Sequence, residues 1–262
     1  YIGFRNVEGQ FDRDWPTSFS AKSILNSIEY DRDVAWWAEG GQGKLKTIFS
    51  TLSLSMKFDT IRFKTIKNKN IDVTMSGDKI HFNNEDEEIN YQAGAMFLNN
   101  GEEIKLSSGQ QIYSFMIPSI VSEIQDETLI VIDEPELYLH PALEIGLIEM
   151  LKTILKNRKS YAIIATHSSL IAREVQRNCV HVLKEATFGT MIDLPTIETY
   201  GESLEEIIGE IFDDYSIKKP YQHEIDDIMD GKLSLNENLD KLSHRIGDEG
   251  LVYLASKINR SN

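Results

Sequence analysis

The chain has 262 residues, a length that suits one large domain or two small ones. Hydrophobic residues make up 41% of the sequence, so a sizeable core can form and disorder is not the expected state. The net charge of −15 argues against a generally basic nucleic-acid surface. No apolar run approaches the ~20 residues of a membrane span, and the single cysteine, Cys179, excludes an internal disulfide. These features predict a cytoplasmic protein that does not enter a membrane.

The first part of the chain, residues 1–105, is predicted to combine helices with β-strands. Apolar residues recur with helical spacing between positions 20 and 58, and a glycine-rich break at 40–43 divides this stretch into two helices. Residues 60–66 alternate between polar and apolar side chains, as a half-buried strand does. Two more strands are expected at 71–75 and 79–82, on either side of a Ser-Gly-Asp turn.

Residues 106–200 change to an α/β pattern. In chain order we expect a helix at 108–123, a strand at 129–132, a helix at 141–156, a strand at 161–165, a helix at 170–176 and a strand at 180–183. The strands at 129–132 and 161–165 are continuous apolar runs, which are typical of strands buried on both faces of a parallel sheet. The alternating order therefore predicts an α/β fold with a doubly wound, mostly parallel sheet.

The last part, residues 201–262, is predicted to be an acidic, helical segment. Between positions 202 and 230 there are ten acidic residues and two basic ones. Such a segment would repel phosphates and could steer a basic protein partner, although a merely solvated helix face is the alternative. Apolar residues lie among the charges and favour the protein contact: Ile211, Phe212, Tyr215 and Tyr221. Two short amphipathic helices are expected around Ile225, Ile228 and Met229 and around Leu239, Leu242 and Ile246.

Two acidic residues, Asp133 and Glu134, directly follow the apolar run that ends at Ile132. Open α/β sheets place their ligands at the carboxyl ends of the strands. Phosphoryl transfer to water needs a metal ion that bridges phosphate oxygens and a group that orients the attacking water. An acidic turn after a core strand is the alternative, but four apolar residues followed by Asp-Glu-Pro are uncommon by chance.

Two other short stretches complete the pattern. Leu106-Ser107-Ser108-Gly109-Gln110 precedes the acidic pair, and Thr166-His167-Ser168 follows the next strand. Backbone N–H groups at the start of a helix bind anions, and we expect Ser108 to cap the helix that begins there. A serine-glycine turn before a helix is common by itself. Together, the three stretches resemble the signature motif, the Walker B strand and the switch-histidine strand of an ABC-type ATPase.

The resemblance to ABC-type ATPases implies a role for each of these residues. It implies that Asp133 holds Mg²⁺ through a water, that Glu134 is the general base for ATP hydrolysis, and that His167 contacts the γ-phosphate and holds Glu134 in place. It further implies that ATP lies between two copies of the protein in a dimer or higher oligomer. The residues that would cover the partner subunit's ATP are Ser107, Ser108, Gly109 and Gln110. Ser108 departs from the glycine that is commonest at its position.

One part of such an enzyme, the phosphate-binding loop Gly-x-x-x-x-Gly-Lys-Ser/Thr, is not found in the sequence. The nearest candidate is Gly43-Lys44, but Ala38 and Leu45 break the motif and the surroundings have helical spacing. We therefore expect the loop upstream of Tyr1. A chain that begins with tyrosine fits a fragment of a longer protein.

The run Leu137-Tyr138-Leu139-His140-Pro141 resembles the ATPases of bacterial anti-phage defence, of the Septu-type or retron-associated systems, rather than transporters. This resemblance implies an ATPase subunit that controls an effector nuclease of the HNH type, with nucleic acid open as a further partner. Two alternatives remain open. One is an SMC-like DNA repair or chromosome ATPase head, against which the short insertion before Leu106 argues. The other is a scaffold that dimerises with ATP without turnover, against which the set Asp133, Glu134 and His167 argues.

Overall fold

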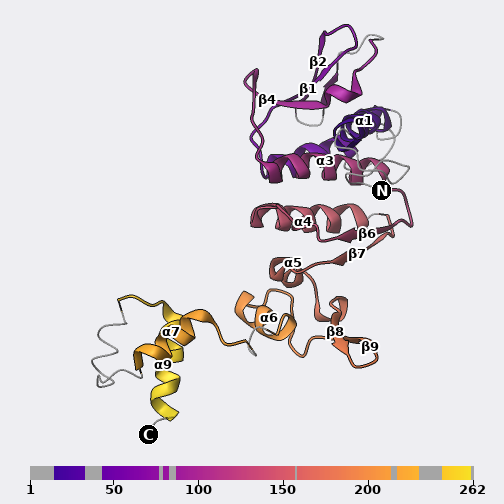
Figure 1. The fold of residues 1–262 in the computed structure, drawn as a ribbon. Helices are drawn as coiled ribbons and strands as arrows, with labels where there is room; N and C mark the ends of the chain where they lie inside the picture. Colours follow the sequence, from indigo (N-terminus) through magenta and orange to yellow (C-terminus); the bar gives the residue numbers. More distant parts are fainter. Residues whose placement is uncertain are drawn as a thin grey trace. The chain divides into compact units, whose positions relative to one another are not determined.

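The computed structural model describes residues 15–32, 43–76, 79–82, 87–156, 158–213, 217–229 and 244–260. The chain divides into two compact units, Tyr1–Gln176 and Arg177–Asn262. Both units contain helices and strands, so the predicted α/β class is confirmed (Figure 1). Among the described helices, none is long and apolar enough to cross a membrane. The division into three parts at positions 105 and 200 stays a prediction.

The first unit contains a five-stranded antiparallel sheet with the strand order β3-β2-β1-β4-β5. The predicted alternation is confirmed in β1, where Ile61 and Phe63 are fully buried and their neighbours are not. On the other face, the guanidinium of Arg62 donates to both carboxylate oxygens of Asp72, which lies directly opposite on β2, at 2.6 and 2.7 Å. The bounds of the strands are β1 Thr60–Lys64, β2 Asn70–Ser76, β3 Lys79–Phe82, β4 Ala95–Asn99 and β5 Glu102–Glu103.

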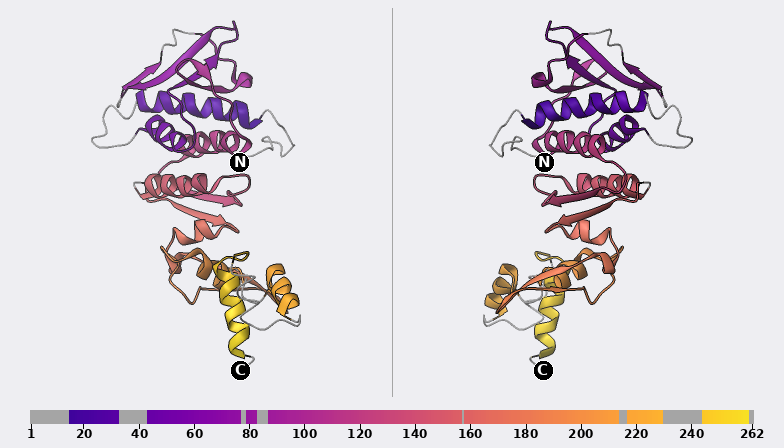
Figure 2. Two further views of the ribbon diagram at one scale, coloured as in Figure 1. Left: turned by 90° about the vertical axis from the view of Figure 1, so that its left-hand side faces the viewer. Right: turned by 90° about the vertical axis from the view of Figure 1, so that its right-hand side faces the viewer.

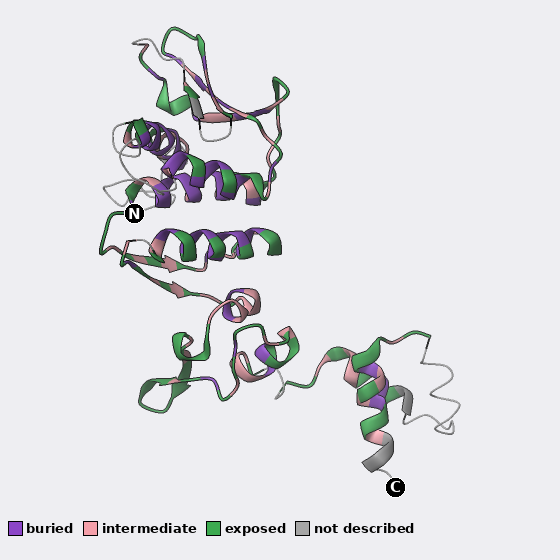
Figure 3. Ribbon diagram, turned by 180° about the vertical axis from the view of Figure 1, so that it is seen from behind, coloured by how far each residue is buried: buried purple, intermediate pink, exposed green. Residues whose placement is uncertain are grey.

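Three helices form the next layer of this unit: α1 (Trp15–Tyr30), α2 (Lys44–Ser53) and α3 (Ser108–Glu123). Pro118 lies inside α3 and has no N–H to donate to the carbonyl of Ser114 one turn earlier. The Ser20 hydroxyl of α1 donates to that carbonyl at 2.8 Å, so a helix–helix contact satisfies the backbone group that the proline leaves open. The buried residues concentrate on the facing sides of these helices (Figure 3). A short 3-10 turn, Tyr91–Ala93, precedes β4.

Below these helices lie α4 (Pro141–Lys156) and the parallel strands β6 (Leu129–Asp133) and β7 (Tyr161–Ala165), followed by α5 (Ser169–Arg173). Figure 2 shows this layer from two sides. The boundaries of α3, α4 and β7 agree with those predicted, because capping residues, a proline and an apolar run mark them in the sequence.

One face of the β6–β7 pair is open in the described residues, which corrects the prediction that both faces are buried. Ile130, Ile132 and Ile164 pack against the core under α4, whereas the opposite face is apolar and exposed. Its side chains are Leu129 (58% exposed), Val131 (71%), Tyr161 (74%) and Ile163 (58%). The strands are therefore apolar on both sides, but only one described layer covers them.

The second unit opens with a 3-10 turn (Arg177–Cys179) and the hairpin of β8 (Val182–Ala186) and β9 (Gly189–Asp193). The prediction of a third parallel strand at 180–183 was wrong, because β8 pairs antiparallel with β9. Among the described strands, β6 and β7 are the one parallel pair. The helices of this unit are α6 Leu204–Ile211, α7 Pro220–Met229 and α9 Asp248–Arg260.

Helices α7 and α9 pack through Ile225 and Leu254, which are almost fully buried. Of the second helix expected around Leu239, Leu242 and Ile246, the first two residues lie outside the described residues, and Ile246 lies in a turn before α9. Asp226 accepts from the Lys218 ammonium at 2.6 Å, and Lys257 of α9 lies 3.2 Å from it. Hydrogen bonds from Lys218 above all, and then from Lys257 and Tyr253, lower the pKa of Asp226 to about 2.

We expect Asp226→Asn to loosen α9 from α7, because it removes the carboxylate that Lys257 and Tyr253 of α9 share. The lowered pKa means that this stabilisation is present above pH 3.8, the ordinary value, and is lost as the pH falls towards 2. Protection factors of residues 248–260, which are corrected for the intrinsic pH dependence of amide exchange, should therefore fall in Asp226→Asn at neutral pH, and in the parent protein as the pH approaches 2. The exposed neighbour Asp227 supplies the control, and an equal effect of Asp227→Asn would contradict the role of Asp226.

Candidate functional site

The register of β6 and β7 brings the predicted acidic and histidine residues to one edge. The last pair of the parallel ladder is Asp133 with Ala165, so the residues that follow each strand leave the sheet together. The Glu134 N–H donates to the Ala165 carbonyl at 2.8 Å and extends the ladder by one bond. Parallel strands put their carboxyl ends at the same edge, which is where open α/β sheets bind ligands.

Glu134 itself has a left-handed backbone, with a φ of +45°. Residues with a Cβ seldom adopt this conformation, and such strain gathers at functional sites. The turn ends β6, and the buried Pro135 follows it. The carboxylate of Glu134 thus leaves the alternation of the strand at the point where the backbone turns.

The structure brings Glu134 and His167 together. Oε1 of Glu134 lies 3.5 Å from Nε2 of His167, and the side chains are 41% and 80% exposed. A carboxylate and an imidazole that lie side by side and open to solvent at a strand edge can orient a water and a phosphate bound next to them. The arrangement fits the roles that the resemblance implies, which stay predictions.

Asp133 ends β6 with an exposed side chain. Carboxylate oxygens are the donors that Mg²⁺ prefers, and Mg²⁺ is commonly held by one or two carboxylates together with substrate phosphates. In the described part of the chain, no group of three or more His, Cys, Asp or Glu residues could hold a metal ion. The exposed Asp133 is suited to contribute to a Mg²⁺ site that a bound nucleotide completes.

The predicted signature residues lie at the start of α3. Ser107, not Ser108 as predicted, is the N-cap, because its hydroxyl accepts from the Gln110 N–H at 3.3 Å. The Gln110 side chain accepts from the Ser107 N–H at 2.9 Å, which completes a capping box. Its Nε2 also donates to the Ser55 carbonyl at 2.6 Å. Ser107 and Gln110 thus hold the helix start in place, and Ser108 is left exposed in the first turn.

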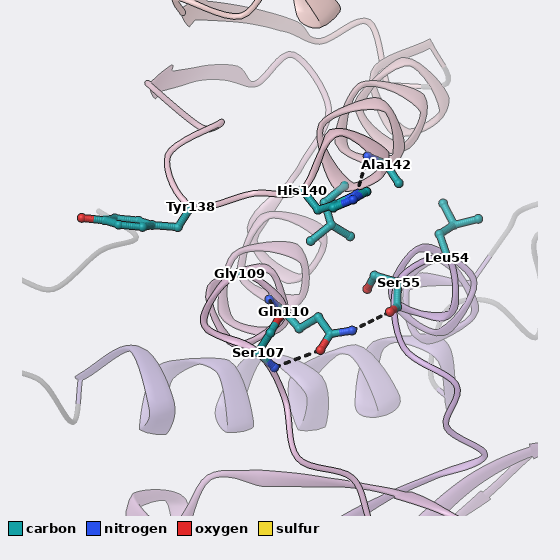
Figure 4. A pocket seen from close by; sticks show the side chains of 9 residues that line it. Leu54, Ser55, Ser107, Gly109, Gln110, Tyr138, His140 and Ala142 are labelled. Carbon is teal, nitrogen blue, oxygen red and sulfur yellow. Dashed lines mark hydrogen bonds between the residues drawn. The ribbon is translucent and has the colours of Figure 1, made fainter.

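Gly109 is buried against the loop that follows β6. A Cβ at this position would lie 2.3 Å from the carbonyl oxygen of Tyr138, a distance at which the backbone has to shift. A cleft of about 280 Å³ opens beside it, between the end of α2 and the starts of α3 and α4 (Figure 4). Its lining includes Ser107, Gly109 and His140, whereas the Tyr138 ring points away from it. As placed here, Ser107, Gly109 and Gln110 serve intrachain contacts.

The rejected phosphate loop at Gly43-Lys44 has a different function in the structure. The Asp31 carboxylate accepts from the N–H groups of Lys44 and Leu45 at 2.7 and 2.8 Å, which places an anion of the chain itself at the start of α2. Burial raises the pKa of Asp31. The Lys44 ammonium is buried and donates to the carbonyls of Ser122 and Ile124, so it is not available to a phosphate.

Two carboxylates near this site were missed by the sequence reasoning, Glu136 and Glu144. Glu136 accepts from the His167 N–H, and Glu144 accepts from the Ser168 hydroxyl. Glu136 stands next to the acidic pair in the sequence, and Glu144 follows eight residues later. A negative charge near an acidic pair does not by itself reveal a tertiary contact.

Comparisons with known proteins place most of the first unit in a family. The family model described as "AAA domain, putative AbiEii toxin, Type IV TA system" matches residues 29–173, more than half of the chain. Protein ea59 of Escherichia phage lambda is 33% identical over 155 residues, 59% of this chain. The chain spans about 30% of that relative's length. A solved chain from work on ATP-driven dimerization and DNA-stimulated activation of SMC ATPases has a TM-score of 0.40 and 12% identity, over 78% of this chain and 97% of that chain.

Proposed function

The chain belongs to this AAA-domain family, and from that premise we propose that it is an ATP-binding and ATP-hydrolysing subunit that controls a partner effector. The observation that carries the proposal is the 3.5 Å approach of Glu134 and His167 at the carboxyl edge of β6 and β7. Glu134 would act as the base for the attacking water, and His167 would contact the γ-phosphate. Phosphate release from ATP by the full-length protein tests this, and no release above background with Mg²⁺ would contradict it.

The proposed cofactors are ATP and Mg²⁺. Mg²⁺, when bound, would supply positive charge that stabilises the phosphates during transfer. Asp133 would hold it through a water, and its exposure at the end of β6 leaves the carboxylate accessible to a nucleotide. Glu134 and His167 would position the water and the transferred phosphate beside it.

We further propose that a lobe outside residues 1–262 carries the phosphate-binding loop and covers the open face of β6 and β7. Two features support this. The sequence contains no Gly-x-x-x-x-Gly-Lys-Ser/Thr, which ATP hydrolysis of this type needs. The exposed side chains of Leu129, Val131, Tyr161 and Ile163 form an apolar sheet face next to the proposed site, and strands that are apolar on both faces are covered on both in α/β proteins.

Val131→Lys tests the covering lobe. If the lobe packs on this face in the full-length protein, the ammonium becomes buried without a partner, and we expect the free energy of unfolding to fall by several kcal/mol. The control is Val252→Lys on α9, since Val252 is exposed to a similar degree, 70% against 71%. Equal and small effects of the two substitutions on denaturant unfolding would contradict the covering lobe.

The proposed setting is bacterial anti-phage defence, with a nuclease of the HNH type as effector. The family description names a toxin–antitoxin system, which is consistent with an ATPase that restrains or releases a toxic partner. The proposed assembly is a self-associated pair with ATP between the subunits. An SMC-like DNA repair head and an ATP-dependent scaffold are the alternatives, and the paired Glu134 and His167 favour turnover over a scaffold.

The acidic C-terminal segment is the proposed contact for the effector, but the structure changes which residues can serve. Asp226 is engaged by Lys218 and Lys257, and Tyr221 packs on Tyr253, so both stabilise their own unit. Exposed acidic side chains remain on α6 and α7. We define the acidic set as Glu205, Glu224 and Asp227.

Neutralising the acidic set with Glu205→Gln, Glu224→Gln and Asp227→Asn should weaken co-purification of a basic nuclease partner and leave ATP hydrolysis nearly unchanged. Charged surfaces chiefly steer association, so the loss should be larger at low salt. The matched control neutralises three exposed acids of the first unit, Glu102, Glu103 and Glu149. Unaltered co-purification at moderate salt would return the segment to a solvated surface.

A further inference from the structure

The loop at 166–168, which carries His167, is held by two carboxylates from the other side of the site. Glu136, two residues after Glu134, accepts a hydrogen bond from the His167 backbone N–H at 2.6 Å. Glu144, in the first turn of α4, accepts one from the Ser168 hydroxyl. The loop is also bonded within itself, because the Ser168 N–H donates to the Thr166 hydroxyl at 2.9 Å.

The position of Glu136 carries an energetic cost, because one of its carboxylate oxygens is buried without a hydrogen-bond donor in the part of the chain that the structure describes. Its Oε1 makes the bond to His167, whereas its Oε2 is buried and has no hydrogen-bond partner among the described residues. A buried carboxylate oxygen without a donor is unfavourable, and such exceptions concentrate at functional sites. A hydrogen bond with an ionised acceptor is stronger than a neutral one, so Glu136 can fix the position of the His167 backbone.

Glu144 is only 7% exposed. The Ser168 hydroxyl that donates to it also accepts from the Ile171 N–H at 3.2 Å and so caps α5. One serine thus connects the start of α5 to the first turn of α4. Since α4 begins a few residues after Glu134, both sides of the Glu134–His167 pair are linked through the same short stretch of chain.

The imidazole of His167 has little else to orient it. It is 80% exposed, and Glu134 at 3.5 Å is its one ionic partner among the described residues. Its direction therefore depends on the backbone of the loop. We propose that Glu136 and Glu144 are positioning residues that hold the loop at 166–168, so that His167 faces Glu134. The inference deepens the proposed ATPase function and takes the role of His167 from it.

We call the hold of Glu136 and Glu144 on the loop at 166–168 the clamp. Hydrogen exchange of the full-length protein tests the clamp and does not depend on ATP hydrolysis. Glu136→Ala removes the acceptor, and we expect exchange of the peptide that contains His167 to rise roughly tenfold or more. Glu136→Gln keeps an oxygen acceptor and should restore most of the protection. Glu149→Ala, an exposed glutamate on α4, is the control. Unchanged exchange in Glu136→Ala, or equal exchange in the Ala and Gln variants, would overturn the clamp.

Kinetics provide the second measurement. Glu136→Ala should lower kcat for ATP roughly tenfold and change KM little, because a displaced group affects the transition state more than ground-state binding. Ser168→Ala removes the bond to Glu144 without substituting a buried residue and should also raise exchange at His167. An unchanged kcat with raised exchange would overturn the positioning role. An inactive parent protein with raised exchange in Glu136→Ala would instead overturn the proposed ATPase and leave the clamp standing.

Discussion

Glu134→Gln in the full-length protein should lower ATP hydrolysis by on the order of 10²-fold or more while ATP still binds, because it removes the proposed general base and keeps the size of the side chain. Asp133, the proposed Mg²⁺ residue, is unchanged by this substitution. The expectation rests on the left-handed backbone at Glu134 and on the 3.5 Å approach of its carboxylate to His167. Steady-state phosphate release and equilibrium binding of ATP separate the two effects.

The same variant should accumulate the ATP-bound assembly, because ATP persists in it. Light scattering at micromolar protein concentration, compared with and without ATP, should then show a two-fold pair when ATP is present. Glu149→Gln is the control for a neutralised glutamate in the same unit. Hydrolysis at the parent rate in Glu134→Gln would refute the role of Glu134 as general base. A strict monomer both with and without ATP would count against a pair that holds ATP between its subunits.

Much of the first unit could be predicted because its signals are local. Pro141 marks the start of α4, and the alternation at Thr60–Lys64 marks a strand with one buried face. The approach of Glu134 and His167 was implied by the resemblance to ABC-type ATPases, and the parallel register of β6 and β7 explains it, because parallel strands bring their carboxyl ends to one edge. The predictions for α4 and β1 depended on local signals, which do not require the details of packing.

The remaining features depend on contacts between distant residues. Ser107 and Ser108 are equally good caps by composition, and Gln110, which bonds to both Ser107 and Ser55, decides between them. The strand at β8 was expected to extend the parallel sheet, but the short turn before β9 lets it pair with its sequence neighbour instead. Glu136 could not be assigned because its partner, the His167 N–H, lies 31 residues away.

Gly109→Ala should lower the free energy of unfolding of the first unit by about 1–3 kcal/mol, the usual cost of overpacking a buried position. The added Cβ would lie 2.3 Å from the Tyr138 carbonyl oxygen, so either α3 or the loop after β6 has to move. Alanine otherwise favours a helix over glycine by roughly 1 kcal/mol, so a loss of stability would have to come from this contact. Denaturant unfolding followed by tryptophan fluorescence measures the change.

Ser108→Ala is the matched control, because Ser108 is the exposed neighbour of Gly109 in the same helical turn. It should leave stability within about 0.5 kcal/mol of the parent, as surface substitutions usually do. The pair of variants separates two roles of the signature stretch. If Gly109 serves only the ATP of a partner subunit, Gly109→Ala should reduce hydrolysis and retain full stability. If it serves the packing described here, stability falls without any nucleotide present. Retained stability in Gly109→Ala would contradict the close approach to Tyr138, and a loss confined to this variant would assign the glycine to the fold of its own chain.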